Sequence, residues 1–278
     1  MTFETPHDLV RAYQAGMKKR FGQHFLSDPS ILARIVDIAD VTRGDHVLEI
    51  GPGCGTLTWE MMQRGAHVHA IEIDPDAAAF LGATFGADER LTLHHADALT
   101  VDLDAVLGAH DGAWKVVSNL PYNVATPIFF RLSERAERFD ALALMYQREV
   151  AQRMVARPGG PQYGALALMA ALDFEATLEM TLPPGAFFPP PKVHSAVVRY
   201  VPIPGGRIPD AAVRARFRQL VRAAFQQRRK TLPNGLKSAG VDKAAARAAM
   251  ESVGLDVRAR AETLSFEQFL GLARALLE

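Results

Sequence analysis

The chain has 278 residues, of which 49% are hydrophobic and 22% charged, proportions that are ordinary for a soluble globular protein. That length suits one large domain or two moderate ones. No apolar run approaches the roughly 20 residues of a membrane helix, and the N-terminus does not resemble a signal peptide. A single cysteine excludes an internal disulfide and a cysteine-rich zinc site, so we expect a cytoplasmic protein.

The formal net charge of zero hides an asymmetry along the chain. Residues 1–199 carry 17 basic against 24 acidic side chains, and residues 200–278 carry 14 against 7. An acidic body followed by a basic tail indicates a polyanionic partner for the tail. The alternative is chance segregation of solvated surface charge.

Residues 1–17 predict a loosely attached helical arm. A basic run, Lys18, Lys19 and Arg20, follows beside aromatic residues and is able to track a phosphate backbone, although charge runs are usually only solvated. Asp28 and Pro29 then supply helix-start chemistry for a helix that buries one face.

The next segment predicts a β–loop–α–β unit, with strands over 46–50 and 68–73 and a helix over 57–64. The loop has the spacing G-x-G-x-G, from Gly51, Gly53 and Gly55, whereas a dinucleotide fingerprint has G-x-G-x-x-G. NAD has a pyrophosphate that must be bound, whereas S-adenosylmethionine has none. This spacing therefore favours S-adenosylmethionine over NAD. Glu72 ends the second strand, where a carboxylate is placed to accept both ribose hydroxyls. The alternative is a glycine-rich turn that binds no ligand.

A third strand, 91–95, leads to Asp97, which either accepts from the adenine amino group of that cofactor or caps the following helix. A fourth strand, 114–117, leads to the sequence S-N-L-P-Y. In an open α/β sheet, ligands bind outside the carboxyl ends of the strands. Four strands that each end in a glycine-rich or polar loop therefore predict one site at this edge.

The S-N-L-P-Y stretch suits the binding of a planar amine. Asn119 Oδ1 and the Leu120 carbonyl are able to accept both N–H bonds of an exocyclic NH2 group and aim its lone pair at a methyl donor. Pro121 stiffens the turn, and Tyr122 offers a face for base stacking. The alternative is an ordinary tight turn after a strand.

The rest of the first part predicts a fifth strand (141–145), a helix (148–157), an apolar segment of undetermined type (163–174) and a terminal strand pair (176–182 and 195–201). Between that pair lies a proline-rich loop. Such a loop is stiff enough to hold Phe187 or Phe188 against the target base opposite Tyr122, or the two rings simply cover the sheet edge.

Residues 202–209 form the predicted boundary between a first domain (1–202, with an N-terminal arm 1–27) and a helical second domain (203–278). The first helix of the second domain places Arg214, Arg218 and Arg222 in a stripe beside its apolar face. Arg228, Arg229 and Lys230 continue it as a basic loop. Helices over 241–253 and 265–277 complete the domain, the last with a capping box from Ser265 and Gln268.

The histidines and the cysteine do not indicate a further functional site. His67 and His69 alternate on a strand, and His94 and His95 are adjacent, so neither pair has metal-ligand spacing. Cys54 has no paired histidine motif. We therefore expect no metal and no covalent intermediate.

The sequence resembles the ribosomal RNA adenine dimethyltransferases, most closely the bacterial KsgA type. The resemblance runs nearly end to end, through F-G-Q-H-F-L, E-I-G-P-G-C-G-T-L-T, I-E-I-D, A-D-A-L, S-N-L-P-Y-N-V-A-T-P-I, F-F-P-P-P-K-V-H-S-A-V-V and R-R-K-T-L. It implies a class I methyltransferase fold, Rossmann-like and α/β, with a mostly parallel sheet, an antiparallel terminal strand pair and a small all-α C-terminal domain. It also implies S-adenosylmethionine as donor, S-adenosylhomocysteine as product, and dimethylation at N6 of two adjacent adenosines near the 3′ end of 16S ribosomal RNA during assembly of the 30S particle.

By matching position, the resemblance implies cofactor contacts from His24, Leu26, Gly51, Glu72, Asp97 and Asn119. It assigns the target amine to Asn119, Leu120 and Tyr122, and matches Phe187 to the aromatic of the proline-rich loop. This chain has His24 where the family often has Asn, and Pro233 and Gly235 where the family commonly has other residues. We expect a monomer that does not bind membranes.

Two rival functions stay open at this point. One is a large-subunit (23S) ribosomal RNA dimethyltransferase of the antibiotic-resistance type, which shares the fold and the chemistry. The other is a ribosome-assembly factor that acts mainly by binding. A DNA adenine or protein glutamine methyltransferase fits less well, because those resemble N/D-P-P-Y rather than N-L-P-Y.

Overall fold

The computed structural model of the chain describes residues 4–16, 24–227 and 230–277. The strands are β1 (Phe25–Leu26), β2 (His46–Ile50), β3 (His67–Glu72), β4 (Leu91–His95), β5 (Trp114–Asn119), β6 (Phe139–Gln147), β7 (Phe174–Leu182), β8 (Phe187–Phe188) and β9 (Ser195–Pro202). The α-helices are α1 (Pro6–Gly16), α2 (Pro29–Ile38), α3 (Thr56–Gln63), α4 (Pro75–Phe85), α5 (Leu103–Leu107), α6 (Ala125–Ser133), α7 (Arg148–Met154), α8 (Ala165–Ala170), α9 (Ala211–Gln226), α10 (Leu232–Gly235), α11 (Lys243–Ser252) and α12 (Phe266–Ala275).

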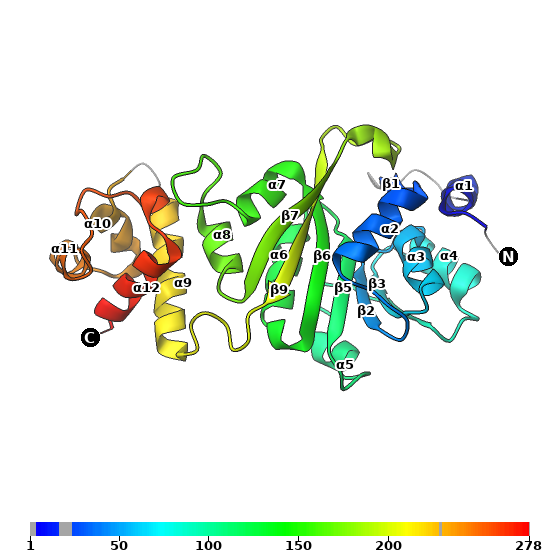
Figure 1. Cartoon of the computed structure of the whole chain (residues 1–278), viewed down its shortest axis with the longest axis horizontal. Coiled ribbons are helices and arrows are strands. Elements are labelled where there is room, and N and C mark those ends of the chain that lie inside the picture. The colour runs from blue at the N-terminus through cyan, green and yellow to red at the C-terminus, as the bar shows by residue number, and fades with distance from the viewer. Residues whose placement is uncertain (1–3, 17–23, 228–229, 278) are drawn as a thin grey trace. The chain divides into compact units, whose positions relative to one another are not determined.

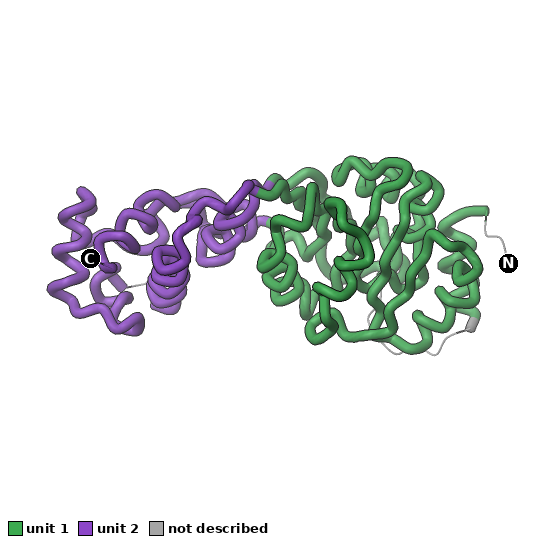
Figure 2. Tube along the Cα trace, turned by 90° about the horizontal axis from the view of Figure 1, so that it is seen from below, with its two compact units in different colours: residues 1–151, 177–202 green, residues 152–176, 203–278 purple. Residues whose placement is uncertain are grey.

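Contacts along the chain divide it into two compact units (Figure 2). The first unit comprises residues 1–151 and 177–202, and the second comprises residues 152–176 and 203–278. The predicted domains assign residues 152–176 to the first part instead. Two contacts hold this segment in the second unit: Arg214 Nη2 lies 2.5 Å from Asp173 Oδ1, and the Tyr163 hydroxyl donates to the Leu264 carbonyl at 2.7 Å. The functional division into domains 1–202 and 203–278 stays a prediction.

The first unit is built on a seven-stranded sheet of order β4-β3-β2-β5-β6-β9-β7. Strands β2 to β6 pair in parallel with their neighbours, and β9 runs antiparallel to β6. The predicted strands at 46–50 and 91–95 have the observed bounds. The segment of undetermined type, 163–174, contains α8 and the first residue of β7.

The sheet is buried on both faces, as expected for parallel strands that alternate with helices. Val117, Ala143 and Val197 on one face share a core cluster with α2 and α3. On the other face, the Phe129 ring of α6 lies 4.8 Å from the Tyr200 ring of β9. Figure 1 labels α2, α3 and α6 beside the strands of the sheet. Because the helices occupy both faces, ligands have access to the sheet at its strand ends.

Start signals in the sequence account for the helix boundaries. The Asp28 carboxylate accepts from two backbone N–H groups at the start of α2, and Ser265 and Gln268 form the predicted capping box of α12. The predicted helix over 148–157 ends earlier, at Met154.

A layer of histidine rings packs around Trp114 in a way that the sequence did not predict. His46 stacks on His110 with ring centroids 3.9 Å apart, and His69 meets the edge of Trp114 at 4.7 Å. Burial, together with repulsion from the neighbouring histidines, lowers the pKa of His69 to about 4, so this ring is neutral near pH 7.

Gly55, at the start of α3, lies against α4 at a point where a side chain would clash. A Cβ atom built on Gly55 would lie 2.6 Å from Leu81 Cδ2 and 2.9 Å from Phe85 Cε2. Gly44 has a similar positive φ, +84° against +82°, but a Cβ there would meet no atom within 4 Å. The two glycines therefore separate the cost of backbone conformation from the cost of overpacking.

We expect Gly44→Ala to lower the free energy of unfolding by about 1 kcal/mol, the cost of a positive φ for alanine. Gly55→Ala should cost about 1–3 kcal/mol more, because the side chains of Leu81 and Phe85 must move. Both tryptophans, Trp59 and Trp114, lie in the first unit, so urea unfolding followed by tryptophan fluorescence reports on it. Equal losses for the two variants would contradict the packing role of Gly55.

Candidate active site

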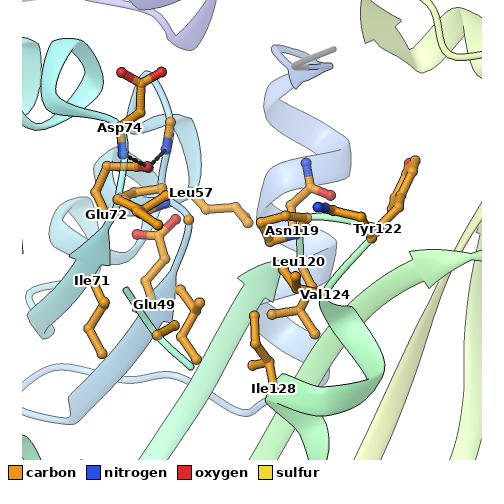
Figure 3. A pocket seen from close by; sticks show the side chains of 18 of the residues that line it. Glu49, Leu57, Ile71, Glu72, Asp74, Asn119, Leu120, Tyr122, Val124 and Ile128 are labelled. Carbon is orange, nitrogen blue, oxygen red and sulfur yellow. Dashed lines mark hydrogen bonds between the residues drawn. The ribbon is translucent and has the colours of Figure 1, made fainter. Parts of the chain in front are cut away.

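A cavity of about 920 Å3 opens at the carboxyl ends of β2, β3, β4 and β5. Figure 3 shows Glu49, Ile71, Glu72 and Asp74 on one wall and the Asn119–Tyr122 turn with Val124 and Ile128 on the other. Most of the predicted site residues line it: His24, Leu26, Gly51, Gly53, Glu72, Asp97, Asn119, Leu120, Pro121 and Tyr122. Gly55 and Phe187 do not line this cavity.

Two contacts join the tips of β2 and β5. The buried Ser118 hydroxyl donates to the Ile50 carbonyl at 2.5 Å. Gly51 follows Ile50, and Pro121 lies three residues after Ser118. A Cβ on Gly51 would lie 3.2 Å from Pro121 Cγ, so the glycine turn and the proline turn pack closely. The turn that carries Asn119 is therefore fixed directly beside the glycine turn.

Glu72 closes the glycine turn. Its carboxylate accepts from the Gly53 N–H at 3.0 Å and from the Asp74 N–H at 2.9 Å, so both oxygens have fixed positions (Figure 3). Burial raises the pKa of Glu72, and these backbone hydrogen bonds partly offset that rise. A carboxylate has about four acceptor sites, so Glu72 retains the capacity to accept from ligand hydroxyls.

The side chain of Asn119 is anchored through its nitrogen. Asn119 Nδ2 donates to the His24 backbone carbonyl at 3.4 Å. With the donor directed at that carbonyl, the oxygen Oδ1 remains as the acceptor of this amide. Asn119 and Leu120 thus bring an amide oxygen and a peptide carbonyl to the same wall of the cavity.

Tyr122 is held by a partner from β9, two strands along the sheet from β5. Its hydroxyl lies 2.6 Å from Ser195 Oγ, a buried residue at the start of β9. Burial raises the pKa of Tyr122, while the Ser195 hydrogen bond lowers it in part. The ring is therefore a neutral phenol at physiological pH with a restricted orientation.

His24 and Asp97 each have a local structural partner as well as a place in the cavity lining. His24 Nδ1 lies 2.6 Å from the Pro189 carbonyl, so that nitrogen carries the proton and Nε2 is the second polar atom of the ring. Asp97 Oδ1 accepts from the Leu99 N–H at 2.8 Å. Asp97 therefore lines the cavity and caps a short turn, but the following helix, α5, has Asp102 as its N-cap, so the predicted helix-capping role of Asp97 is wrong.

The structure does not bring Phe187 to the cavity as expected from the sequence. Its side chain is 3% exposed and belongs to the core cluster that contains Leu26. The physical reason is the pairing of β8 with β1, which sets Phe187 opposite Leu26. Phe188, the alternative considered from the sequence, is 54% exposed.

Sequence reasoning missed Glu49, which lines the cavity although it is only 1% exposed. Thr58 Oγ1 donates to its carboxyl group at 2.6 Å. Burial, opposed in part by the Thr58 hydrogen bond and reinforced by the nearby charge of Glu72, raises the pKa of Glu49 to about 8. An acid inside the apolar run 46–50 was the available signal, because a buried carboxyl group is usually functional or paired.

Only part of the predicted RNA-binding set lies in the described residues. On α9, Arg222 is exposed and Arg218 is half-buried, and Lys230 beyond it is exposed, whereas Arg214 is engaged with Asp173. The remaining members of the set lie outside the described residues: Lys18, Lys19, Arg20, Arg228 and Arg229.

Two further observations bear on the chemistry of the described part of the chain. Across residues 4–16, 24–227 and 230–277, no group of three or more His, Cys, Asp or Glu side chains is placed to hold a metal ion. Within the same ranges, no helix is both long and apolar enough to cross a membrane. Cys54 is buried, and burial raises the pKa of its thiol, which makes it a poor nucleophile.

A family model described as ribosomal RNA adenine dimethylase matches residues 15–277. The chain belongs to this family. This dimethylase is 41% identical to a ribosomal RNA small subunit methyltransferase A from Geobacter metallireducens, with 94% of this chain and 95% of that protein covered. A protein of the same name from Bordetella pertussis is 44% identical, with 96% of each chain covered.

Solved structures place the dimethylase among methyltransferase folds. A dimethyladenosine transferase from Plasmodium falciparum has a TM-score of 0.76 at 25% identity, covering 90% of this chain and 96% of that one. The 23S rRNA methyltransferase ErmE has a TM-score of 0.69 at 26% identity, covering 91% and 100%. The predicted family, the methyltransferase class of enzyme and the Rossmann-like fold are confirmed.

Glu49 should make the stability of the dimethylase depend on pH. Its pKa rises from about 4.3 in the unfolded chain to about 8 in the fold, so between these values the folded state binds the proton more tightly. The free energy of unfolding therefore falls progressively as pH rises through this window. A pKa difference of this size corresponds to a total loss on the order of a few kcal/mol.

Glu49→Gln removes this titration and keeps an acceptor for Thr58. We expect the variant to gain stability relative to the parent protein as pH rises from 5 to 8, measured by urea unfolding with tryptophan fluorescence at several pH values. The difference in the free energy of unfolding between the two proteins cancels the contributions of groups that both proteins share. A stability difference that stays constant with pH would show that Glu49 is ionised throughout.

Proposed function

We propose that this chain transfers methyl groups from S-adenosylmethionine to N6 of two adjacent adenosines near the 3′ end of small-subunit ribosomal RNA, and does so during assembly of the 30S particle. The observation that carries the proposal is the close contact between the glycine turn and the Asn119–Tyr122 turn. It brings two carbonyl-type acceptors next to a cavity whose opposite wall bears Glu72.

The residues around the glycine turn fit the donor. Glu72 has fixed oxygens that suit two ribose hydroxyls, and Asp97 at the end of β4 suits the adenine amino group. Gly53 has no side chain, which suits close approach of its backbone to a ligand, and a Cβ there would lie only 3.0 Å from the Phe25 ring. The donor supplies an electrophilic methyl group on a sulfonium centre. His24 and Leu26 complete this side of the cavity.

The opposite wall accounts for activation of the amine. The lone pair of an exocyclic adenine nitrogen is conjugated with the ring, which makes the amine a poor nucleophile. Asn119 Oδ1 and the Leu120 carbonyl accept its two N–H bonds, favour a pyramidal nitrogen and direct the lone pair toward the methyl group. Pro121 keeps the turn rigid, and Tyr122 supports the base by stacking.

No strong base is required from the protein. The nitrogen that has gained a methyl group is acidic and loses its proton to water after transfer. For the second transfer the monomethylated amine must turn and bind again, with one N–H left to donate. The wall next to Tyr122 therefore has to accommodate one methyl group.

The choice of the small subunit is supported by the relatives. Proteins named ribosomal RNA small subunit methyltransferase A reach 41% to 44% identity over more than nine-tenths of the chain, compared with 26% for the 23S enzyme ErmE. The large-subunit reaction is thus the weaker candidate. We propose that the protein acts in the cytoplasm, where ribosomal subunits are assembled. We also propose that it acts as a monomer.

The basic second unit is proposed to bind the ribosomal RNA. Arg218 and Arg222 on α9, with Lys230 and the basic residues 18–20 and 228–229, would contact phosphates, which fix position rather than sequence. Binding of this kind serves either a catalytic role or a role in assembly.

Asn119→Ala should lower the rate of methyl transfer by about two to three orders of magnitude. This is the usual effect of removing one preorganised hydrogen bond to a transition state. Affinity for S-adenosylmethionine should change little, because Glu72 and the glycine turn are untouched. Labelled methyl transfer to under-methylated small subunits, with isothermal titration of the donor, measures both. Asn234→Ala, which changes the same residue type on α10 outside the cavity, is the control. Full activity of the Asn119 variant would remove this residue from the mechanism.

Reversing charge on α9 should weaken RNA binding. We expect Arg218→Glu with Arg222→Glu to reduce affinity for the small subunit about ten-fold or more at moderate salt, and to lower the slope of log affinity against log salt. Arg247→Glu with Arg274→Glu changes the net charge equally at exposed positions on α11 and α12. Equal losses in the two pairs would mean that overall charge, rather than the α9 stripe, determines binding.

A further inference from the structure

The two-residue strands β1 and β8 form an antiparallel ribbon beside the cavity. Its register sets Phe25 opposite Phe188 and Leu26 opposite Phe187. In an antiparallel pair, residues directly opposite each other project to the same face, and successive residues project to opposite faces. Leu26 and Phe187 are both buried in the core cluster, so Phe25 and Phe188 share the other face.

The ribbon borders the cavity, which both residues of β1 line. Phe25 is one of the residues that line it, and its ring would contact a Cβ on Gly53. Phe188 is 54% exposed, an unusual degree of exposure for a large aromatic residue of this chain. The ribbon therefore presents a solvent-accessible aromatic ring next to the cavity mouth.

The loop around Phe188 is fixed at both ends. His24 Nδ1 lies 2.6 Å from the carbonyl of Pro189, and the Arg148 N–H donates to the His194 carbonyl at 2.9 Å. Prolines 189–191 restrict the backbone between these points. The ring is thus held in place before any ligand binds, which lowers the entropy cost of binding.

The surroundings of the ring favour a nucleic acid. Lys192 and His194 in the same loop are exposed, so a cation and a titratable ring lie close along the chain to the aromatic side chain. Aromatic faces combined with positive charge are the elements with which proteins bind unpaired nucleotides. Every base has a π-face, so such stacking does not require a particular sequence.

We propose that Phe188 is a stacking platform for the unpaired base next to the target adenosine. The inference rests on the proposed function, in which the target base enters the cavity beside Tyr122. The base that follows or precedes it in the strand then lies at the cavity mouth and stacks on Phe188, while Lys192 faces the connecting phosphates. The role is binding of a flanking nucleotide, distinct from the contact with the target base.

Substitution of the ring tests the proposal. Phe188→Ala should raise KM for the under-methylated small subunit about ten-fold, with the affinity for S-adenosylmethionine unchanged and kcat at saturating RNA close to that of the parent protein. Phe188→Trp should preserve KM, because it keeps a stacking face. Val193→Ala is the control for loss of exposed apolar surface, since Val193 is 41% exposed on the same loop.

A second measurement identifies the partner of the ring. Short RNAs that contain the target adenosines are prepared with an abasic residue on either side, and their affinities are measured. One of these substitutions should weaken binding to the parent protein and have no further effect on Phe188→Ala. In Phe188→Trp, the added fluorescence should be quenched by the intact RNA and much less by that abasic one.

The outcomes separate the two proposals. If the parent protein does not methylate the small subunit, the proposed function fails. If it does, and Phe188→Ala retains the parent KM, the stacking role is wrong. If KM rises but the abasic penalty persists in Phe188→Ala, the ring contacts something other than the flanking base, such as a ribosomal protein, and the inference is again overturned.

Discussion

The join between the tips of β2 and β5 is the constraint on which the candidate site depends. The Ser118–Ile50 hydrogen bond and the packing of Pro121 on Gly51 fix two turns that are separated by about seventy residues in the sequence. One turn has the backbone room and the carboxylate that a donor needs, and the other has the acceptors that an amine needs. Methyl transfer by direct displacement depends on the relative position of donor and acceptor, so a rigid contact between the turns is the structural requirement for this chemistry.

The charges around the cavity are consistent with that chemistry. The wall with Glu49 and Glu72 is acidic, whereas the Asn119–Tyr122 wall has only neutral polar groups. Under the proposed function, the acidic wall favours a cationic donor over its neutral product, S-adenosylhomocysteine. The neutral wall favours an amine that is uncharged before transfer. Burial raises the pKa of Glu49 to about 8, so this carboxyl group is mainly protonated near pH 7 and adds little negative charge to the wall.

The sequence predicted the parts of this arrangement that local patterns determine. The strands 46–50 and 91–95, the start of α2 at Asp28 and the cavity residues Glu72 and Asn119 follow from periodicity, capping chemistry and position at strand ends. The role of each site residue stays a prediction, although most of them line one cavity.

What the sequence did not predict depends on contacts between distant segments. Phe187 and Phe188 are interchangeable in the sequence, and only the pairing of β8 with β1 determines which ring is buried. The packing of Gly55 depends on Leu81 of α4, and the grouping of 152–176 with the second unit depends on the Asp173–Arg214 pair. Glu49 was missed because strand periodicity does not distinguish a buried carboxyl group from an apolar neighbour.

The most direct test of the account is a crystal structure of the protein with S-adenosylmethionine bound. We predict that the ribose hydroxyls lie within hydrogen-bond distance of Glu72, and that the sulfonium methyl carbon faces the Asn119 side chain and the Leu120 carbonyl across the cavity. A donor that binds elsewhere, or whose methyl group points away from the Asn119–Tyr122 turn, would contradict the central claim that the joined turns align the two reactants.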